Sequence, residues 1–105
     1  MTKRSEILAE ADGLINGPRQ EHYGSPAENF GVVAEMWSAY IGATVSPADV
    51  CHMMTLLKVA RLRNGPHHDS SVDACGYMAL GGELVEQSCE RRRTRMLAHS
   101  AGTSG

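Results

Sequence analysis

Two short segments of the chain, residues 25–28 (SPAE) and 46–49 (SPAD), share a pattern that strongly constrains the fold. A serine at the N-cap, a proline at the first helical position and an acid three residues after the serine form the capping box that begins an α-helix. Hydrophobic residues follow both segments at helical spacing, which predicts one helix to about Ile41 and another to about Arg63.

Two further helices are predicted on either side of this pair. Residues 5–15 carry apolar side chains at helical spacing, and Gly17-Pro18 ends that segment. Residues 70–73 (SSVD) have the capping offset again and begin a helix to about Met96. No segment alternates with period two for long enough to predict a strand. We therefore expect an all-α, four-helix bundle-like fold, with a single domain over residues 1–97 and a disordered tail over residues 98–105.

Composition narrows the class of protein. A net charge of -2, from 10 basic and 12 acidic residues, gives no general electrostatic reason to bind nucleic acid or a membrane. There is no signal peptide pattern and no apolar run of about 18 residues. The 3 cysteines lack CxxC spacing, which favours free thiols in a reducing compartment. These features predict a soluble intracellular protein.

Self-association is also expected. The helix over residues 26–41 is apolar over a wide arc that includes Val32, Met36 and Tyr40. A chain of 105 residues with four short helices buries only a modest core and can hardly cover that arc alone. We therefore expect a homo-oligomer, a dimer or a tetramer.

Polar side chains interrupt three of the predicted apolar stripes. On helical wheels of about 100° per residue, Asn29 joins the stripe of its helix, Arg61 joins the next with Lys58 at the border, and Asp73 heads the last. An unpaired buried charge costs several kcal/mol, so these groups need partners or a polar pocket. In one interpretation Arg61 and Asp73 form a structural salt bridge. In the other, these side chains line a ligand pocket together with Lys58, Asp69 and the loop of residues 19–24 (RQEHYG).

Such a pocket suits phosphate chemistry. Lys58 and Arg61 can bind phosphate oxygens, the arginine with a bidentate fork. Glu28, Asp69 and Asp73 supply the hard oxygen ligands that Mg²⁺ takes in proteins. Water activated by such an ion can attack a phosphoanhydride.

The motifs RQEHYGSPAENF, SPADV, LLKVARL and DSSVDACGY, with a tryptophan between the first two, resemble a family of small phage and prophage domains of uncharacterised function. The resemblance spans about Arg19 to Leu84. More distantly, YG followed by KxxR and DxxxDxxxY is similar to nucleotide modification associated domains and to MazG-like all-α NTP pyrophosphatases.

The MazG-like resemblance implies a dimeric or tetrameric helical enzyme that uses carboxylates and Mg²⁺ to cleave a nucleoside triphosphate to the monophosphate and pyrophosphate. It implies that Asp69 and Asp73 form the second acidic pair of the superfamily and that Glu28 belongs to the first. The chain departs from the family pattern, because Glu28 is followed by Glu35 in place of ExxE and the second pair is four apart.

Three hypotheses follow. The first is a Mg²⁺-dependent nucleotide pyrophosphohydrolase whose site residues are Glu28, Asp69 and Asp73 for catalysis and metal, Lys58 and Arg61 for phosphate, and Asn29, Tyr23 and Arg19 for the rest of the nucleotide. The second is a non-catalytic protein that binds or sequesters a nucleotide on the same scaffold. The third is a small helical oligomer that binds a host protein.

Overall fold

The computed structural model describes residues 2–17 and 24–103. These residues form the α-helices α1 (Lys3–Asn16), α3 (Pro26–Ile41), α4 (Pro47–Ala60) and α5 (His68–Thr103), and the 3₁₀ helix η1 (Arg61–Asn64). No strand occurs in either described range, and the four long elements are all α-helical. The all-α prediction is therefore confirmed.

Two of the three predicted serine caps form, at Ser25 and Ser46, and the reciprocal capping box is found at Ser46. The Ser46 hydroxyl accepts a hydrogen bond from the Asp49 N–H at 3.0 Å, and the Ser46 N–H donates to an Asp49 carboxylate oxygen at 3.0 Å. At the start of α3, the Ser25 hydroxyl accepts from the Glu28 N–H at 3.1 Å. Each cap satisfies backbone donors that have no partner inside the helix, which fixes where α3 and α4 begin.

The connection between α4 and α5 differs from the prediction. α4 ends at Ala60 and tightens into η1, where the sequence predicts α-helix to about Arg63. The turn then passes through Gly65, whose φ of 131° favours glycine. His67 caps α5, because its Nδ1 accepts from the Ser70 N–H at 3.2 Å. α5 consequently begins at His68, two residues before the predicted serine cap.

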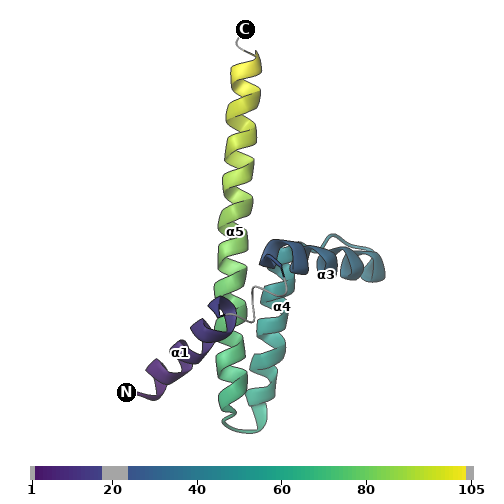
Figure 1. Ribbon diagram of the computed structural model, residues 1–105. Coiled ribbons are helices and arrows are strands. Elements are labelled where there is room, and N and C mark those ends of the chain that lie inside the picture. Colours follow the sequence, from purple (N-terminus) through teal and green to yellow (C-terminus); the bar gives the residue numbers. More distant parts are fainter. Residues whose placement is uncertain (1, 18–23, 104–105) are drawn as a thin grey trace.

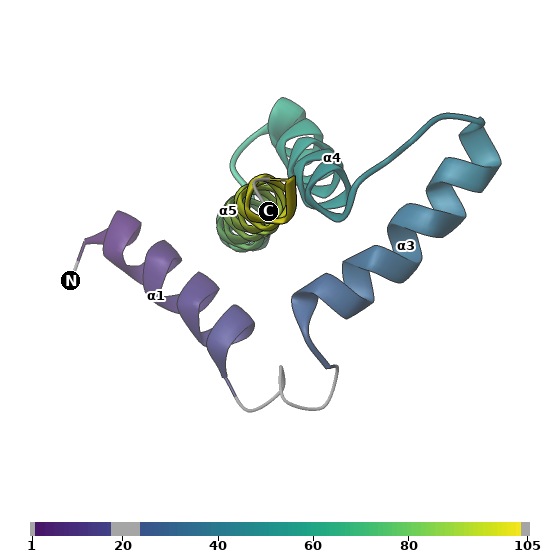
Figure 2. The same ribbon diagram turned by 90° about the horizontal axis from the view of Figure 1, so that it is seen from above.

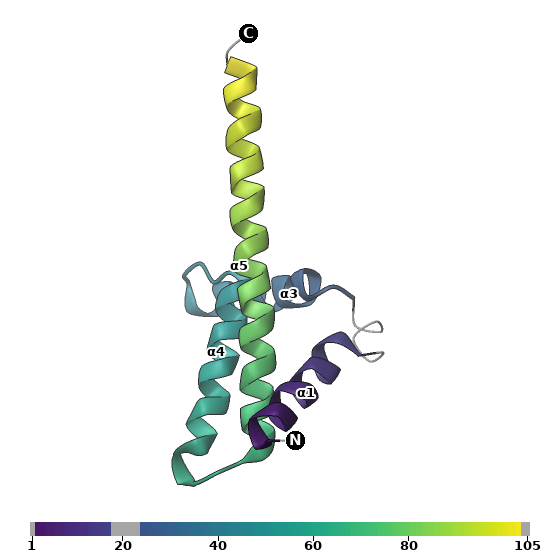
Figure 3. The same cartoon turned by 90° about the vertical axis from the view of Figure 1, so that its left-hand side faces the viewer.

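α5 is the longest element, with 36 residues, and it runs to Thr103 instead of about Met96. α4 lies antiparallel to its first half, so the two form a helical hairpin (Figure 1). α1 packs against α5 and α3 against α4, and both leave the hairpin as separate arms (Figures 2 and 3). The expected bundle-like arrangement is therefore replaced by a hairpin with two arms.

A small hydrophobic cluster and a close helix–helix contact hold these elements together. Between α3 and α4, buried side chains pack with the half-buried Phe30, Val33, Trp37 and Met54; the buried members are Ala34, Val45 and Val50. Between α4 and α5, an added Cβ on Gly81 would lie 2.9 Å from the His52 ring and 3.1 Å from the Cys51 Cβ. The absence of a side chain at Gly81 therefore allows the two helices of the hairpin to approach closely.

The shape leaves much surface uncovered. The radius of gyration is 17.1 Å, whereas a compact domain of this length has about 13 Å. The accessible surface is 7695 Å², whereas a compact monomer of the same mass exposes about 5,700 Å². The chain thus exposes about 2,000 Å² more than a compact monomer does, which is more than one side of a standard protein interface buries.

Candidate functional site

An open cavity of about 430 Å³ lies between α1 and the first turns of α5. Its acidic lining residues are Glu10 of α1 and Asp69 and Asp73 of α5. Gly13, Leu14 and Val72 form the rest of the wall. Asp69 and Asp73 are one helical turn apart, so they face the same side of α5. The structure therefore brings the two predicted aspartates into one concavity.

Lys58 is the cation beside these carboxylates. Its Nζ lies 3.1 Å from Asp73 Oδ2, and only 14% of the lysine side chain is exposed, against 34% for the aspartate. Low exposure strengthens the attraction because less water screens it. The ion pair joins the C-terminal part of α4 to the start of α5. The ion-pair partner of Asp73 is thus Lys58, whereas one of the two interpretations of the sequence paired Asp73 with Arg61.

Arg61 is the first residue of η1 and its side chain is exposed. The helical wheel placed Arg61 on the stripe of Val50, Met54 and Leu57. Leu57 is itself 49% exposed, so this stripe already faces solvent before α4 ends. Lys58, inside α4, is the residue that faces α5.

The remaining predicted residues lie elsewhere. Glu28 and Asn29 are exposed in the first turn of α3, and Tyr23 and Arg19 lie outside the described residues. Within residues 2–17 and 24–103, no group of three or more histidine, cysteine, aspartate or glutamate side chains is close enough to hold a metal ion. The structure therefore does not bring Glu28 together with Asp69 and Asp73 as one three-carboxylate group.

Two residues that the sequence analysis missed belong to the cavity region. His68 Nε2 lies 2.7 Å from Glu10 Oε2, which joins α5 to α1. The other ring nitrogen, Nδ1, is buried and has no hydrogen-bond partner among the described residues. Without an acceptor at Nδ1, a neutral ring favours the proton on Nε2, where it is donated to Glu10. The sequence signal that could have indicated this contact is Glu10, an acidic residue that lies at helical spacing between the apolar Ile7 and Leu14.

A second, apolar cavity of about 480 Å³ opens on α3 and α4 and is lined by Met36, Trp37, Tyr40, Ile41 and Met53. Tyr40 is 92% exposed and Met36 is 65% exposed. Asn29 is exposed as well, so the prediction that it points into the core is wrong, whereas Val33 of the same stripe is half-buried against the core cluster. α3 turns a different side, with Phe30 and Ala34, towards the core.

Comparison with known proteins places the chain in a family. Residues 6–85 match the family described as a domain of unknown function, DUF6378. The chain belongs to this family. The match includes α3, α4 and the cavity residues, and it ends where α5 leaves the hairpin. The expected membership of a small phage-type family of uncharacterised function is thereby confirmed.

Two phage proteins are similar to this DUF6378 chain. The Gene 55 protein of Mycobacterium phage D29 is 40% identical over 85 residues, which cover 80% of this chain and 56% of the relative. The Gene 55 protein of Mycobacterium phage L5 is 47% identical over 76 residues, which cover 70% of this chain and 49% of the relative. The chain spans about half the length of the curated relatives it matches.

The comparison with solved structures and the search for membrane spans do not extend this family assignment. No solved structure matches the chain. The MazG-like resemblance is not among the matches and stays a prediction. Within the described part of this DUF6378 member, none of the helices has the length and apolar character needed to span a membrane.

Proposed function

We propose that the cavity between α1 and α5 binds the phosphates of a nucleoside triphosphate together with Mg²⁺, and that the protein cleaves the bound nucleotide to the monophosphate and pyrophosphate. The observation that carries the proposal is the double role of Asp73. It lines the cavity with Asp69 and Glu10, and it also holds the Lys58 ammonium at 3.1 Å. Asp73 thus links the carboxylates that line the cavity to a cation on α4.

The donor set fits Mg²⁺ in type. This ion commonly uses one or two protein carboxylates and completes its shell with water and substrate phosphate oxygens. In the proposal Asp69 and Asp73 are the two carboxylates, and Glu10 lines the same cavity. When bound, Mg²⁺ would neutralise phosphate charge and polarise the phosphoanhydride.

Lys58 supplies the fixed positive charge. An ammonium group has three N–H donors, so its contact with Asp73 leaves two for phosphate oxygens. Because the lysine is largely buried and paired, its position is set before a ligand arrives, which lowers the entropy cost of binding. In this proposal Arg61, which is exposed in η1, contacts outer phosphate oxygens.

The experiment is incubation of the purified protein with each common ribo- and deoxyribonucleoside triphosphate, with and without Mg²⁺, and chromatography of the products. Metal-dependent formation of a monophosphate supports the proposal. Thermal stabilisation by a nucleotide without turnover would instead indicate a nucleotide-binding protein that is not an enzyme. Ligand at about 100 times its dissociation constant should add about 2.7 kcal/mol to the free energy of unfolding.

The exposed apolar surface of α3 and α4 favours a second candidate function, a helical module that binds another protein. Exposed apolar patches of this kind commonly mark protein-binding sites. Tyr40→Lys places a charge at the most exposed aromatic residue without touching the core. If no nucleotide is bound or hydrolysed and Tyr40→Lys abolishes association of the protein, the second candidate replaces the first.

A further inference from the structure

The second half of α5 is exposed along its described length, and only its first two turns lie beside the start of α4, where Ser88 and Arg91 line a cavity with Pro47. Every side chain from Val85 to Ser100 is exposed, and the helix projects beyond α3 and α4 (Figure 1). Isolated helices of this length are only marginally stable in water, and most helical stability in proteins comes from packing. This half also lies beyond residue 85, where the DUF6378 match ends. It is therefore a separate feature from the cavity near α1.

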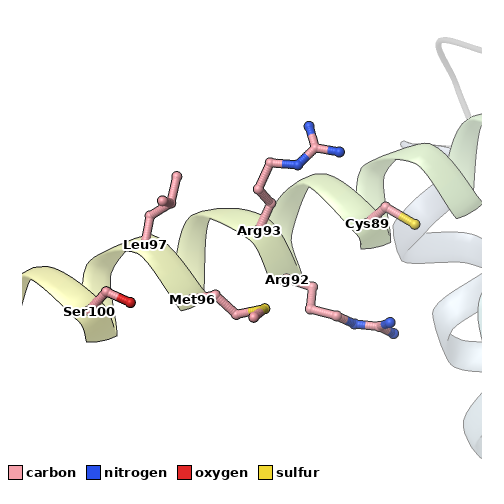
Figure 4. Close-up of a pocket in the computed structure, with 6 residues that line it drawn as sticks. All are labelled: Cys89, Arg92, Arg93, Met96, Leu97 and Ser100. Carbon is pink, nitrogen blue, oxygen red and sulfur yellow. The ribbon is translucent and has the colours of Figure 1, made fainter.

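One face of this half carries a heptad pattern. The residues are Gly82, Glu86, Cys89, Arg93, Met96 and Ser100, spaced alternately four and three apart. That spacing keeps the six side chains on one side of the helix, and Cys89 and Met96 are the apolar residues among them. Cys89, Arg93, Met96 and Ser100 line one shallow concavity on the bare helix, together with Arg92 and Leu97 (Figure 4). Met96 and Leu97 are 65% and 66% exposed there.

The charges on this face have opposite signs on the two sides of Cys89. Glu86 stands three residues before it and Arg93 four residues after it. When two such helices cross antiparallel at Cys89, Glu86 of each copy lies opposite Arg93 of the other. A parallel pair in register would instead place glutamate against glutamate and arginine against arginine. Like charges across an interface are repulsive, so the charge pattern selects the antiparallel arrangement.

The sizes of the side chains agree with the same arrangement. In the antiparallel pair, Gly82 of one helix lies near Met96 and Leu97 of the other. An added Cβ on Gly82 would meet nothing within 4 Å, so there is room on that side for a large residue. Within its own chain, Arg93 contacts Glu90 at 3.1 Å. The two side chains are 69% and 68% exposed, so this ion pair is weak and Arg93 can exchange it for a partner on the other helix.

We propose that two copies of this chain associate through the projecting half of α5, antiparallel and centred on Cys89, with Glu86 of each copy paired to Arg93 of the other. The chain as a whole exposes about 2,000 Å² more than a compact monomer, and a standard interface buries about 800 Å² per partner. The proposal is independent of the nucleotide site.

The test measures the dimer dissociation constant of the full chain by analytical ultracentrifugation. Glu86→Arg and Arg93→Glu each place like charges together twice in a two-fold dimer, and each should raise the constant at least about tenfold. The double variant Glu86→Arg/Arg93→Glu restores both pairs and should return the constant to near the wild-type value. Arg91→Glu makes the same charge change on the opposite side of the helix and should have little effect.

Disulfide crosslinking tests the direction of the pair. Mild oxidation should link wild-type chains through Cys89, and Cys89→Ser should abolish the link. Met96→Cys in the Cys89→Ser background should not crosslink, because the two introduced thiols would be about 20 Å apart in the antiparallel pair. A monomeric wild type, a dimer insensitive to the charge changes, a failed rescue, or efficient crosslinking at position 96 would each overturn the proposal.

Discussion

Lys58 Nζ lies 3.1 Å from Asp73 Oδ2, and this contact joins the C-terminal part of α4 to the first turns of α5. It lies at the edge of the acidic cavity, so the same aspartate stabilises the hairpin and faces the proposed ligand. A partly buried pair of this kind is costly to break on one side only, because the remaining charge keeps its desolvation cost without the attraction.

The first prediction concerns this ion pair. Asp73→Leu should lower the free energy of unfolding by about 1–3 kcal/mol, because it leaves the largely buried Lys58 ammonium without its partner. Lys58→Met/Asp73→Leu should recover most of that loss by replacing the pair with apolar contact. Urea denaturation measures both. Arg61→Met, at an exposed neighbour, should change stability by less than about 0.5 kcal/mol. Lys58→Met alone is measured as well. If the double variant loses as much free energy of unfolding as Lys58→Met and Asp73→Leu lose together, this interpretation is contradicted.

The second prediction compares two adjacent glycines of α5. Gly81→Ala should destabilise the protein by about 1–3 kcal/mol, since its Cβ would lie 2.9 Å from the His52 ring and 3.1 Å from the Cys51 Cβ. Gly82→Ala meets nothing within 4 Å and should stabilise the helix by about 0.5–1 kcal/mol. Thermal and urea unfolding of the two variants give the comparison. Equal effects would mean that α4 and α5 do not approach closely at Gly81.

The third prediction concerns pH. Burial of Cys51 raises the pKa of its thiol from 9.0 to about 11. The folded state therefore favours the protonated thiol, and its stabilising effect is complete below pH 9 and is lost as the pH rises towards 11. The loss should be on the order of 2–3 kcal/mol, at about 1.4 kcal/mol per pH unit.

Urea denaturation across pH 8 to 11 checks this sign, with Cys51→Ala as the control. The difference in stability between wild type and Cys51→Ala should shrink as the pH rises. The exposed Cys89 should react with a thiol reagent at neutral pH in the native protein, whereas the buried Cys51 should react only on unfolding. Rapid native labelling of Cys51 would show that α4 and α5 do not enclose it.

The fourth prediction concerns the proposed ligand. Asp69 is exposed, so Asp69→Asn should leave the fold intact while it weakens Mg²⁺-dependent nucleotide stabilisation by at least about tenfold in apparent affinity. Glu35→Gln removes an exposed carboxylate from α3, away from the cavity, and should bind as wild type does. Calorimetry with and without Mg²⁺ measures both. Unchanged binding by Asp69→Asn would remove this carboxylate from the proposed site.

Local signals in the sequence were sufficient for most of the elements. The Ser-Pro caps predicted where α3 and α4 begin, because a cap depends on only four consecutive residues. Helical spacing predicted an all-α chain. The spacing of Asp69 and Asp73 also placed them on one side of α5, and both line the cavity. These results depend on contacts within about one turn of helix.

The tertiary structure decided which sides of the helices face inward. A helical wheel shows that α3 has a wide apolar arc, but only packing against α4 buries Ala34 and Phe30 while Tyr40 stays exposed. The packing of α4 on α5 made Lys58, and not the exposed Arg61, the ion-pair partner of Asp73. Glu10 reached the cavity only through the packing of α1 on α5. By itself, then, the sequence determined the helices, their caps and the spacing of the aspartates. The partners of the charged side chains depended on contacts between residues far apart in the chain, which local spacing does not encode.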